Sequence, residues 1–428
     1  MILALFLGLF VLLILGVPIF ISIALPSMTA IQLFTDTQAI VMAQRFFAGL
    51  DKFGIMAMPL FIFAAEVMLR GGIARRLLDW VKTIVSWLPG GTAFAAHFAC
   101  MFFGAICGSS PATVAAIGGI MYPELLKDKY SEKFSVGLIS SSASVAILIP
   151  PSVTLIMYGV ASGVSIGALF IAGIGAGLVY TLILAIYIYV WVRRQGMKDR
   201  VKFNLRIFGR KTLDAIWSIG ITLIILGGIY SGVFTATEAA GVSTLYAIIV
   251  SMFIYKEMDL KQLYKTAVKA GTTCAQVMVL TAAASAFGWL LTVSQVPQHL
   301  ASAFLSVTDS PMMFLLFCNI IFLIAGCFMD GSGAVMILTP IMYPLGMQMG
   351  INGVLLGVII TTNLAIGMIT PPLGLNLFVA NGITGVPMTR MIPAIIPFFL
   401  VSLVALIIVT YVPAVSMYLP SIVYPGSW

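Results

Sequence analysis

Long apolar stretches separated by short polar ones run along the whole chain. The longest occupy residues 1–25, 53–69, 166–191, 216–233, 241–255 and 393–412. Each approaches or reaches the roughly 20 residues that a helix needs to cross the hydrocarbon core of a bilayer. Together with shorter apolar runs, this pattern predicts an all-α polytopic membrane protein with about ten membrane segments.

The first apolar run lacks the basic start and the small-residue cleavage site of a signal peptide, so we interpret it as a retained helix. Gly16-Val17-Pro18 can divide this run into two short helices, which leaves the start of the topology open. An external N-terminus is favoured only by the symmetry of the repeat described below.

Composition and charge agree with a membrane protein. The 428 residues are 61% hydrophobic and 8% charged, whereas a soluble domain is about 25% charged. The net charge of +8 comes mostly from loops: residues 193–211 hold eight Lys or Arg, and residues 256–269 hold four. We expect both loops to face the cytoplasm. Because no basic stripe is interleaved with aromatic residues outside the membrane, nucleic-acid binding is excluded.

A polar tetrapeptide interrupts the apolar residues between two basic stretches, at 70–82 and 127–133. Gly108-Ser109-Ser110-Pro111 predicts the tip of a re-entrant hairpin that enters from the cytoplasm. Irregular backbone at membrane depth is tolerated where it lines a polar cavity, so this tip should face one. Two short helices joined by a buried turn remain the alternative.

Two sequence landmarks recur at the same distance. Ile120-Met121-Tyr122-Pro123 is repeated at positions 341–344, and Pro150-Pro151 is repeated as Pro371-Pro372, so that both copies lie 221 positions further on. We interpret this as a duplication. Five crossings between the copies would invert the second one, and inverted repeats with broken helices are typical of alternating-access carriers.

The duplication predicts two inverted repeats, each with a re-entrant helical hairpin and a discontinuous transmembrane helix. The first covers residues 1–210, with its hairpin at about 90–121 and its broken helix at about 134–163. The second covers residues 211–428, with its hairpin at about 311–342 and its broken helix at about 351–381. Its tip, Asp330-Gly331-Ser332-Gly333, should enter from the opposite face.

The proline pairs indicate cation sites. Consecutive prolines remove two backbone donors, so carbonyls of the preceding turn lack partners. A dehydrated Na⁺ could be coordinated by those carbonyls and by hydroxyls from the tips or from the polar runs 140–144 and 361–363. A proline kink hydrated by water remains the alternative. Half-helix N-termini after the prolines would favour an anionic substrate.

Acidic residues within apolar segments are candidates for function. Glu238 follows Thr235 at helix-start spacing and is interpreted as a capping residue. Glu66 lies four residues before Arg70, so a structural ion pair and a place in the pathway are both open. Asp330 is the favoured functional carboxylate. With few buried carboxylates and no histidine chain, sodium coupling is preferred to proton coupling.

Several motifs resemble those of one family. They are Met58-Pro59-Leu60-Phe61, Ala65-Glu66, Arg70-Gly71-Gly72, residues 108–113, Ile149-Pro150-Pro151-Ser152, Asp330-Gly331 and residues 370–374. Over nearly its whole length the chain resembles the large membrane subunit of tripartite ATP-independent periplasmic (TRAP) transporters. The resemblance implies an elevator-type, Na⁺-driven carrier of the ion-transporter superfamily in the bacterial inner membrane.

The same resemblance implies partners and solutes. The partners would be a small four-helix membrane subunit, expected here as a separate polypeptide, and a periplasmic binding protein that delivers the substrate. The solutes would be carboxylated, such as sialic acid or C4-dicarboxylates. Sialic acid is slightly preferred, because Arg390 is the one arginine near the cavity side of the second repeat. No rigid site for the two carboxylates of a dicarboxylate is therefore evident. No organic cofactor is expected.

Site residues follow by matching motifs. For Na⁺ the resemblance implies Ser109, Ser110, Ala143, Ile149 and Pro150 in the first half, and Gly331, Ser332, Gly367, Thr370 and Pro371 in the second. Asp330 joins them as the acidic residue of the second tip. Polar candidates for substrate contact are Thr113, Ser152, Thr154, Asn363, Asn376 and Arg390.

Some functions other than tripartite transport would share several of these features. A stand-alone Na⁺/dicarboxylate symporter would share the fold and ion sites but need no binding protein. A channel would also use broken helices. An enzyme is excluded, because the sequence has no zinc-binding His/Glu spacing, no Ser/His pair and no phosphate-binding Gly-Lys motif.

Overall fold

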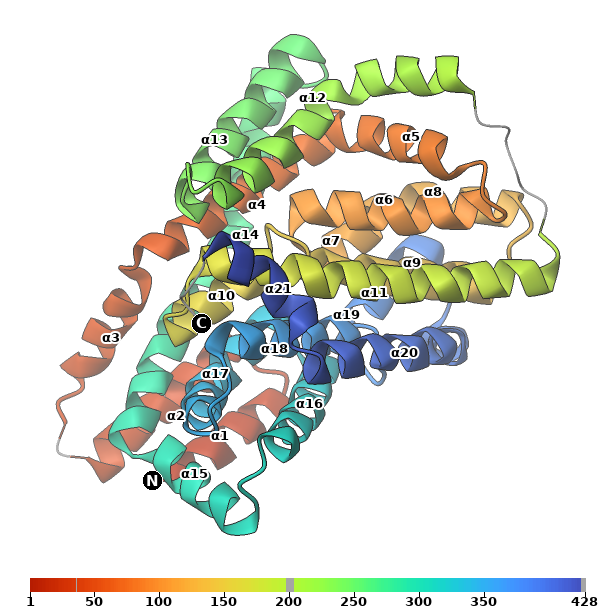
Figure 1. Ribbon diagram of the computed structural model, residues 1–428. Coiled ribbons are helices and arrows are strands. Elements are labelled where there is room, and N and C mark those ends of the chain that lie inside the picture. Colours follow the sequence, from red (N-terminus) through yellow and green to blue (C-terminus); the bar gives the residue numbers. More distant parts are fainter. Residues whose placement is uncertain (36, 198–203, 425–428) are drawn as a thin grey trace.

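The computed structural model describes residues 1–35, 37–197 and 204–424. Within these residues the chain is helical and contains no strand (Figure 1). Seven helical segments are long and apolar enough to cross a membrane, and eight shorter apolar helices accompany them. The seven are fewer than the roughly ten expected, because several expected segments are split into short helices. The prediction of an all-helical polytopic membrane protein is confirmed.

Apolar side chains face outward along the long helices. On α11 (Ile166–Gln195), Leu178, Leu182 and Ile186 recur every four residues and are each more than half exposed. Such a stripe would be costly in water but suits contact with lipid chains.

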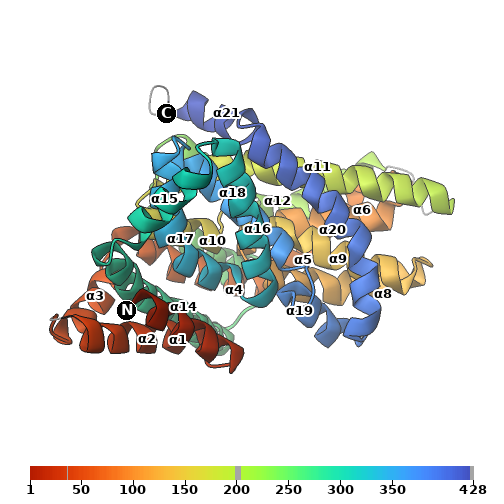
Figure 2. The same cartoon turned by 90° about the horizontal axis from the view of Figure 1, so that it is seen from below.

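The first quarter of the chain forms short helices and one spanning segment. The helices are α1 (Ile2–Ile14), α2 (Ile19–Phe34), α3 (Ile40–Leu50), the 3₁₀ turn η1 (Phe53–Met56), α4 (Ala57–Arg70) and α5 (Ile73–Val85). Gly16 has a φ of 75° between α1 and α2, so the first apolar run is divided there. Figures 1 and 2 place α1 and α2 beside one end of α14 (Leu260–Val293).

The first predicted hairpin and broken helix follow. Their elements are α6 (Gly91–Cys107), α7 (Ser110–Thr113), the π-helical turn η2 (Val114–Gly118), α8 (Gly119–Lys127), α9 (Glu132–Ala143), the 3₁₀ turn η3 (Ser144–Ile147) and α10 (Val153–Ser162). The returning arm ends at Lys127 rather than near 121, because the helix continues through Pro123. The π-helical turn η2 directly precedes α8, which contains Pro123.

Central helices connect the two halves. They are α12 (Leu205–Tyr230), α13 (Ala236–Ile249), the π-helical turn η4 (Val250–Ile254), α14 and α15 (Val296–Val307). Thr235 and Glu238 form a reciprocal capping box at the start of α13, which confirms the capping role of Glu238. Lys198, Arg200 and Lys202 of the predicted cytoplasmic loop lie outside the described residues.

The second half closes the fold with elements of similar lengths to those of the first. They are α16 (Pro311–Phe328), α17 (Gly331–Gln348), α18 (Gly353–Gly367), α19 (Leu375–Thr384), α20 (Met388–Tyr411) and α21 (Ala414–Val423). Here the returning arm α17 contains Pro340 and Pro344 and again runs past its expected end near 342.

Helices α11 and α20 pack side by side in opposite directions. Tyr180 Oη lies 3.0 Å from Ser402 Oγ, whereas the ring of Tyr187, further along α11, packs at 4.9 Å on Phe398, earlier in α20. Rising residue numbers on one helix therefore meet falling numbers on the other.

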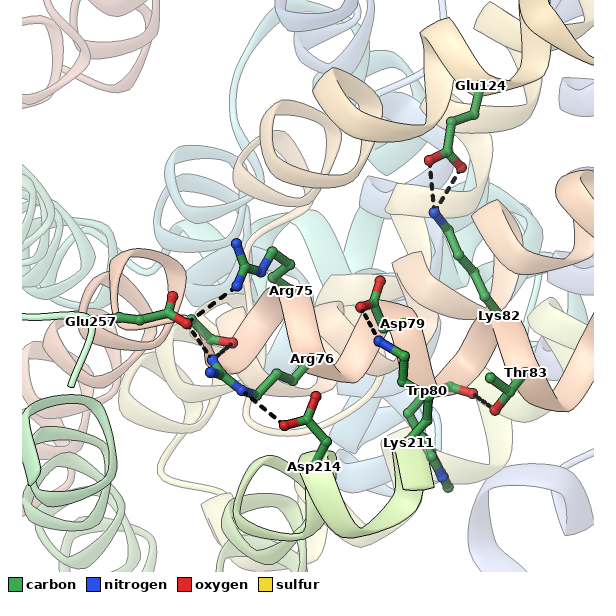
Figure 3. Close-up of polar contacts among 11 residues, drawn as sticks. Arg75, Arg76, Asp79, Trp80, Lys82, Thr83, Glu124, Lys211, Asp214 and Glu257 are labelled. Carbon is green, nitrogen blue, oxygen red and sulfur yellow. Dashed lines mark hydrogen bonds and ion pairs between the residues drawn. The ribbon is translucent and has the colours of Figure 1, made fainter. Parts of the chain in front are cut away.

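The amphipathic helix α5 is fixed by ion pairs at both ends (Figure 3). Near its start, Arg76 Nη1 lies 2.7 Å from Glu257 Oε1, and its guanidinium also stacks 3.7 Å from the centre of the Tyr255 ring. Towards its end, Lys82 Nζ lies 2.7 Å from Glu124 Oε2 on α8. This helix therefore links the α12–α14 region to the first hairpin.

Candidate functional site

Each hairpin tip is bonded to the helix break of its own half. The breaks contain the cis peptide bonds Pro150–Pro151 and Pro371–Pro372. The backbone N–H of Val153, just after the first break, donates to Gly108 O at 3.5 Å. In the second half, the N–H of Gly374 donates to Cys327 O at 3.2 Å. The two breaks are therefore held against the two tips by main-chain bonds.

Glycine allows the incoming arm of each hairpin to approach the helix before its break. A Cβ on Gly104 would lie 2.6 Å from Ala146 Cα. A Cβ on Gly367 would lie 2.5 Å from Gly326 Cα. Since real Cβ atoms do not approach other atoms so closely, small residues are required at these contacts, as is common between membrane helices.

The same tips also contact the half-helix of the opposite half. Asn376, near the start of α19, lies within 2.9 Å of the Ser110 hydroxyl in the first tip. Its amide nitrogen also donates to Ser140 O at 3.0 Å and to Ser144 Oγ at 3.1 Å. On the other side, a Cβ on Gly331 would lie 3.2 Å from Thr154 Oγ1 on α10. Asn376 thus connects both halves in one buried polar cluster.

The serine run on α9 supplies buried hydroxyls. Ser140 Oγ and Ser141 Oγ have no hydrogen-bond partner and are fully buried. Ser142 Oγ lies 2.8 Å from His97 Nδ1, and His97 Nε2 lies 3.0 Å from Thr181 O. His97 is therefore a packed histidine, with both ring nitrogens in hydrogen bonds. The two orphaned hydroxyls are the groups here that a bound cation would satisfy.

Asp330 caps the returning arm of the second hairpin. Its carboxylate accepts the backbone N–H groups of Ser332 at 3.0 Å and Gly333 at 3.4 Å. The cap uses one oxygen of the carboxylate, and the residue also lines a cavity between the tips. The Asp330 side chain can therefore cap α17 with one carboxylate oxygen while the other remains for a ligand in the cavity.

A cavity of about 220 Å³ lies where the two tips meet. Both breaks contribute to its wall, through Ile147 and Val153 in the first half and Met368 and Leu375 in the second. Its polar lining consists of Glu66, Ser109, Ser110, Thr154, Thr273, Asp330 and Ser332. We call this space the inner cavity.

Glu66 forms ion pairs at the rim of the inner cavity. Its carboxylate lies 2.8 Å from Lys269 Nζ and 3.8 Å from Arg70 Nε. Lys269 and Thr273 lie one turn apart on α14, so both face α4. Sequence reasoning missed these two residues, although the series Lys269, Thr273, Val277 marks one face of that helix.

Other predicted residues lie beside the inner cavity without lining it. Ala143, Ile149 and Pro150 are buried at the first break, and Gly367 is buried against Gly326. Thr370 Oγ1 donates to Ile366 O at 2.7 Å, next to the partly buried Pro371.

Among the predicted substrate residues, Thr154 lines the inner cavity and Asn376 touches the first tip. The other four do not line it. The Thr113 hydroxyl donates to Ser109 O, and Ser152 caps α10 while donating to Ile147 O at 2.6 Å. Asn363 bonds to Asn319 Oδ1 at 2.7 Å in a separate buried network, and Arg390 is exposed, 3.6 Å from Glu132.

The oxygen donors around the tips are hydroxyls, carbonyls and single carboxylates. Among the described residues, no group of three or more His, Cys, Asp or Glu side chains could hold a metal ion together. Neutral oxygen donors suit an alkali cation better than a transition metal, which prefers imidazole and thiolate ligands.

Comparison with known proteins identifies the family. Residues 6–415 match the family described as the DctM component of the tripartite ATP-independent periplasmic transporter. The chain is 42% identical over 400 residues to the C4-dicarboxylate TRAP transporter large permease protein DctM of Pseudomonas aeruginosa. This alignment covers 94% of each of the two chains. The chain is 36% identical to the ectoine/5-hydroxyectoine TRAP transporter large permease protein UehC of Ruegeria pomeroyi, over 98% of each chain.

A solved structure shares the fold. The YdaH transporter of Alcanivorax borkumensis superposes with a TM-score of 0.62 over 89% of this chain and 88% of that one, at 16% identity. The family match covers almost the whole sequence, and the polytopic helical fold agrees with it. The chain therefore belongs to the DctM family of TRAP transporter large permeases, and it is a multi-pass transport protein of the bacterial inner membrane and not an enzyme.

Proposed function

We propose that this chain drives Na⁺-coupled uptake of a small carboxylated solute by alternating access, with the inner cavity as the solute site. The observation that carries this proposal is the meeting of both hairpin tips and both helix breaks around one space of about 220 Å³. In other carriers, substrate and coupling ions bind near the bilayer midplane, where broken helices from two halves meet.

The cation sites of the proposal lie at the two tips. In the first half, the buried Ser140 and Ser141 hydroxyls lack partners beside the Ser110 tip. In the second half, Asp330 and Ser332 lie at the tip opposite the Thr370–Pro371 break. The proline pairs remove the helical donors of carbonyls in the preceding turn. Ile147 O, Gly367 O and Met368 O each accept one other hydrogen bond, and each carbonyl keeps a second lone pair with which it could coordinate Na⁺.

Two inverted repeats and an elevator movement belong to the same proposal. The returning arms begin at Ser110 and Gly331, 221 positions apart, and α11 and α20 begin at Ile166 and Met388, 222 positions apart. The antiparallel packing of α11 and α20 supports inversion. We propose that the hairpins and broken helices move together against α4 and α14.

Charge indicates which side the inner cavity faces. Glu66, Arg70 and Lys269 surround its rim, and Lys269 belongs to the basic loop expected in the cytoplasm. The arrangement therefore corresponds to an inward-facing state, in which solute from the inner cavity would leave towards the cytoplasm.

The solute class rests on chemistry and relatives together. The N-terminus of α10 adjoins the cavity and favours an anion, whereas that of α17 is already capped by the Asp330 carboxylate. The relative at 42% identity is named for C4-dicarboxylates, and another, 39% identical over 407 residues, is the isethionate TRAP transporter permease protein DctMQ of Oleidesulfovibrio alaskensis. We therefore propose a C4-dicarboxylate as the solute; sialic acid is the second candidate.

Two partners complete the proposed transporter. The family description names a tripartite periplasmic system, so we propose a small four-helix membrane subunit and a periplasmic binding protein that delivers the solute. The DctMQ relative supports a second membrane part, because this chain spans 64% of its length. A stand-alone symporter, which would need neither partner, is the competing function.

The test is uptake of radiolabelled succinate and sialic acid into proteoliposomes that contain this chain and the small subunit. The cognate binding protein and an inward Na⁺ gradient are each added or omitted. We expect accumulation of succinate above its external concentration only when both are present. Uptake without the binding protein would establish the stand-alone symporter, and uptake indifferent to Na⁺ would refute the cation sites.

A further inference from the structure

A second cavity, of about 250 Å³, lies between α14 and the second hairpin. We call it the outer cavity. Its wall includes Lys52, Val160, Ser285, Trp289 and Thr339, and it shares no lining residue with the inner cavity. Neither the motifs nor the proposed transport cycle account for it.

The outer cavity lies further along the helices that line the inner one. On α10, Thr154 lines the inner cavity and Ala161 the outer cavity, a rise of about 10 Å at 1.5 Å per residue. α14 and α17 also line both spaces. Between them, Thr281 Oγ1 touches Met157 Sδ at 3.6 Å, and both residues are buried. Met157 follows Thr154 and precedes Ala161 on α10, so this contact lies between the two cavities along that helix.

Lys52 gives the outer cavity a positive charge. Its Nζ donates to Val160 O at 2.8 Å, and among the described residues no carboxylate lies within ion-pair distance of it. Although Lys52 as a whole is an exposed residue, partial desolvation of its amine lowers the pKa of Lys52 below its usual value. Lys52 also lines a third cavity of about 660 Å³ beside the starts of α11 and α13. An anion that passes from this third cavity to the outer cavity would therefore pass Lys52, which lines both.

Thr339 provides a second, independent feature. It lies on α17, is completely buried, and its hydroxyl has no hydrogen-bond partner. Buried hydroxyls are nearly always paired, so this orphan on a residue that lines the outer cavity marks a group that a bound acceptor would satisfy. The indole of Trp289 forms an apolar wall nearby, with the Arg45 guanidinium 5.1 Å from its ring centre.

We propose that the outer cavity is a second binding site for a small carboxylate solute, held by Lys52 and Thr339 before it passes the Met157–Thr281 contact to the inner cavity. This inference rests on the proposed function for the identity of the solute. Lys52 would pair with the carboxylate, and the Thr339 hydroxyl would donate to one of its oxygens.

Equilibrium binding of radiolabelled succinate to the purified membrane complex in phosphatidylcholine nanodiscs tests the proposal. We expect two classes of site in the wild-type complex. Lys52→Gln and Thr339→Val should each weaken one class by about tenfold or more, whereas Lys52→Arg, which keeps the charge, should retain it. Thr292→Val is the matched control, because the Thr292 hydroxyl at the cavity edge already donates to Gly288 O at 2.8 Å.

Thr154→Val separates this inference from the proposed function, because it alters only the inner cavity. If Thr154→Val removes the one class present and the Lys52 and Thr339 variants change nothing, the outer site is refuted and the inner site stands. If no succinate binds to the wild-type complex, both proposals fail. If phosphatidylglycerol in the nanodiscs abolishes the Lys52-dependent class, the cavity binds a lipid headgroup and the inference is overturned. Melting temperatures identify variants that misfold.

Discussion

Replacing Asn376 with alanine should impair Na⁺ binding at the first tip. The side-chain amide joins Ser110 Oγ, Ser140 O and Ser144 Oγ, and all four residues are fully buried. Truncation would leave three buried polar groups without this partner, at about 1–3 kcal/mol each. Because Ser144 Oγ already contacts Ser140 O at 3.4 Å, part of this cost is relieved. We expect a net loss of about 2–4 kcal/mol.

This loss should appear as a lower apparent affinity of transport for Na⁺, because the Asn376 amide holds the first tip against the serine run of α9. A cost of about 2–4 kcal/mol corresponds to a rise of roughly thirty-fold to nearly a thousandfold in the half-saturating Na⁺ concentration. The assay is succinate uptake into proteoliposomes over a Na⁺ titration, with the melting temperature measured in parallel.

Asn381→Ala is the matched control for Asn376→Ala. Asn381 lies on the same helix, but its amide donates at 2.7 Å to Val386 O at the other end of α19. Its half-saturating Na⁺ concentration should remain close to that of the wild type. A folded Asn376→Ala protein with unchanged Na⁺ dependence would refute the role of this cluster in cation binding.

Two further predictions concern stability, measured as the melting temperature of the purified chain. Gly367→Ala should destabilise the fold by about 1–3 kcal/mol, because its Cβ would lie 2.5 Å from a backbone atom, whereas Gly382→Ala, with open space around it, should not; equal melting temperatures would contradict the close helix contact. Arg76→Gln should cost about 1–2 kcal/mol, because this arginine combines the ion pair with Glu257 shown in Figure 3 with a stacked tyrosine ring. Arg390→Gln, which removes one exposed pair at 3.6 Å, should cost much less, and similar losses for both arginine variants would show that the α5 contacts are unimportant.

Sequence reasoning located the landmarks of the fold because they depend on local chemistry. Proline pairs cannot continue a helix, and Gly108 and Asp330 mark tips where glycine conformation or a capping carboxylate is needed. Helix ends were less predictable. The returning arms were expected to end near residues 121 and 342, yet both helices continue through Pro123 and Pro344, since packing against neighbouring helices can offset a missing backbone donor.

The lining of the inner cavity was only partly predictable from sequence. Ser110 and Asp330 carry local signals, whereas Lys269 and Thr273 reach the site through the packing of α14 on α4, which no local pattern encodes. Arg390 was expected at the cavity because of its place in the chain, but α20 begins at the surface there. Long-range packing decides such positions.

The measurement that tests Na⁺ coupling most directly is the entry of radiolabelled Na⁺ during solute uptake by the complete transporter. Proteoliposomes are prepared with equal Na⁺ concentrations inside and outside, and succinate is then supplied with the binding protein. We predict that an inward succinate gradient drives Na⁺ into the vesicles in proportion to the succinate taken up. Succinate accumulation without accompanying Na⁺ entry would contradict the account.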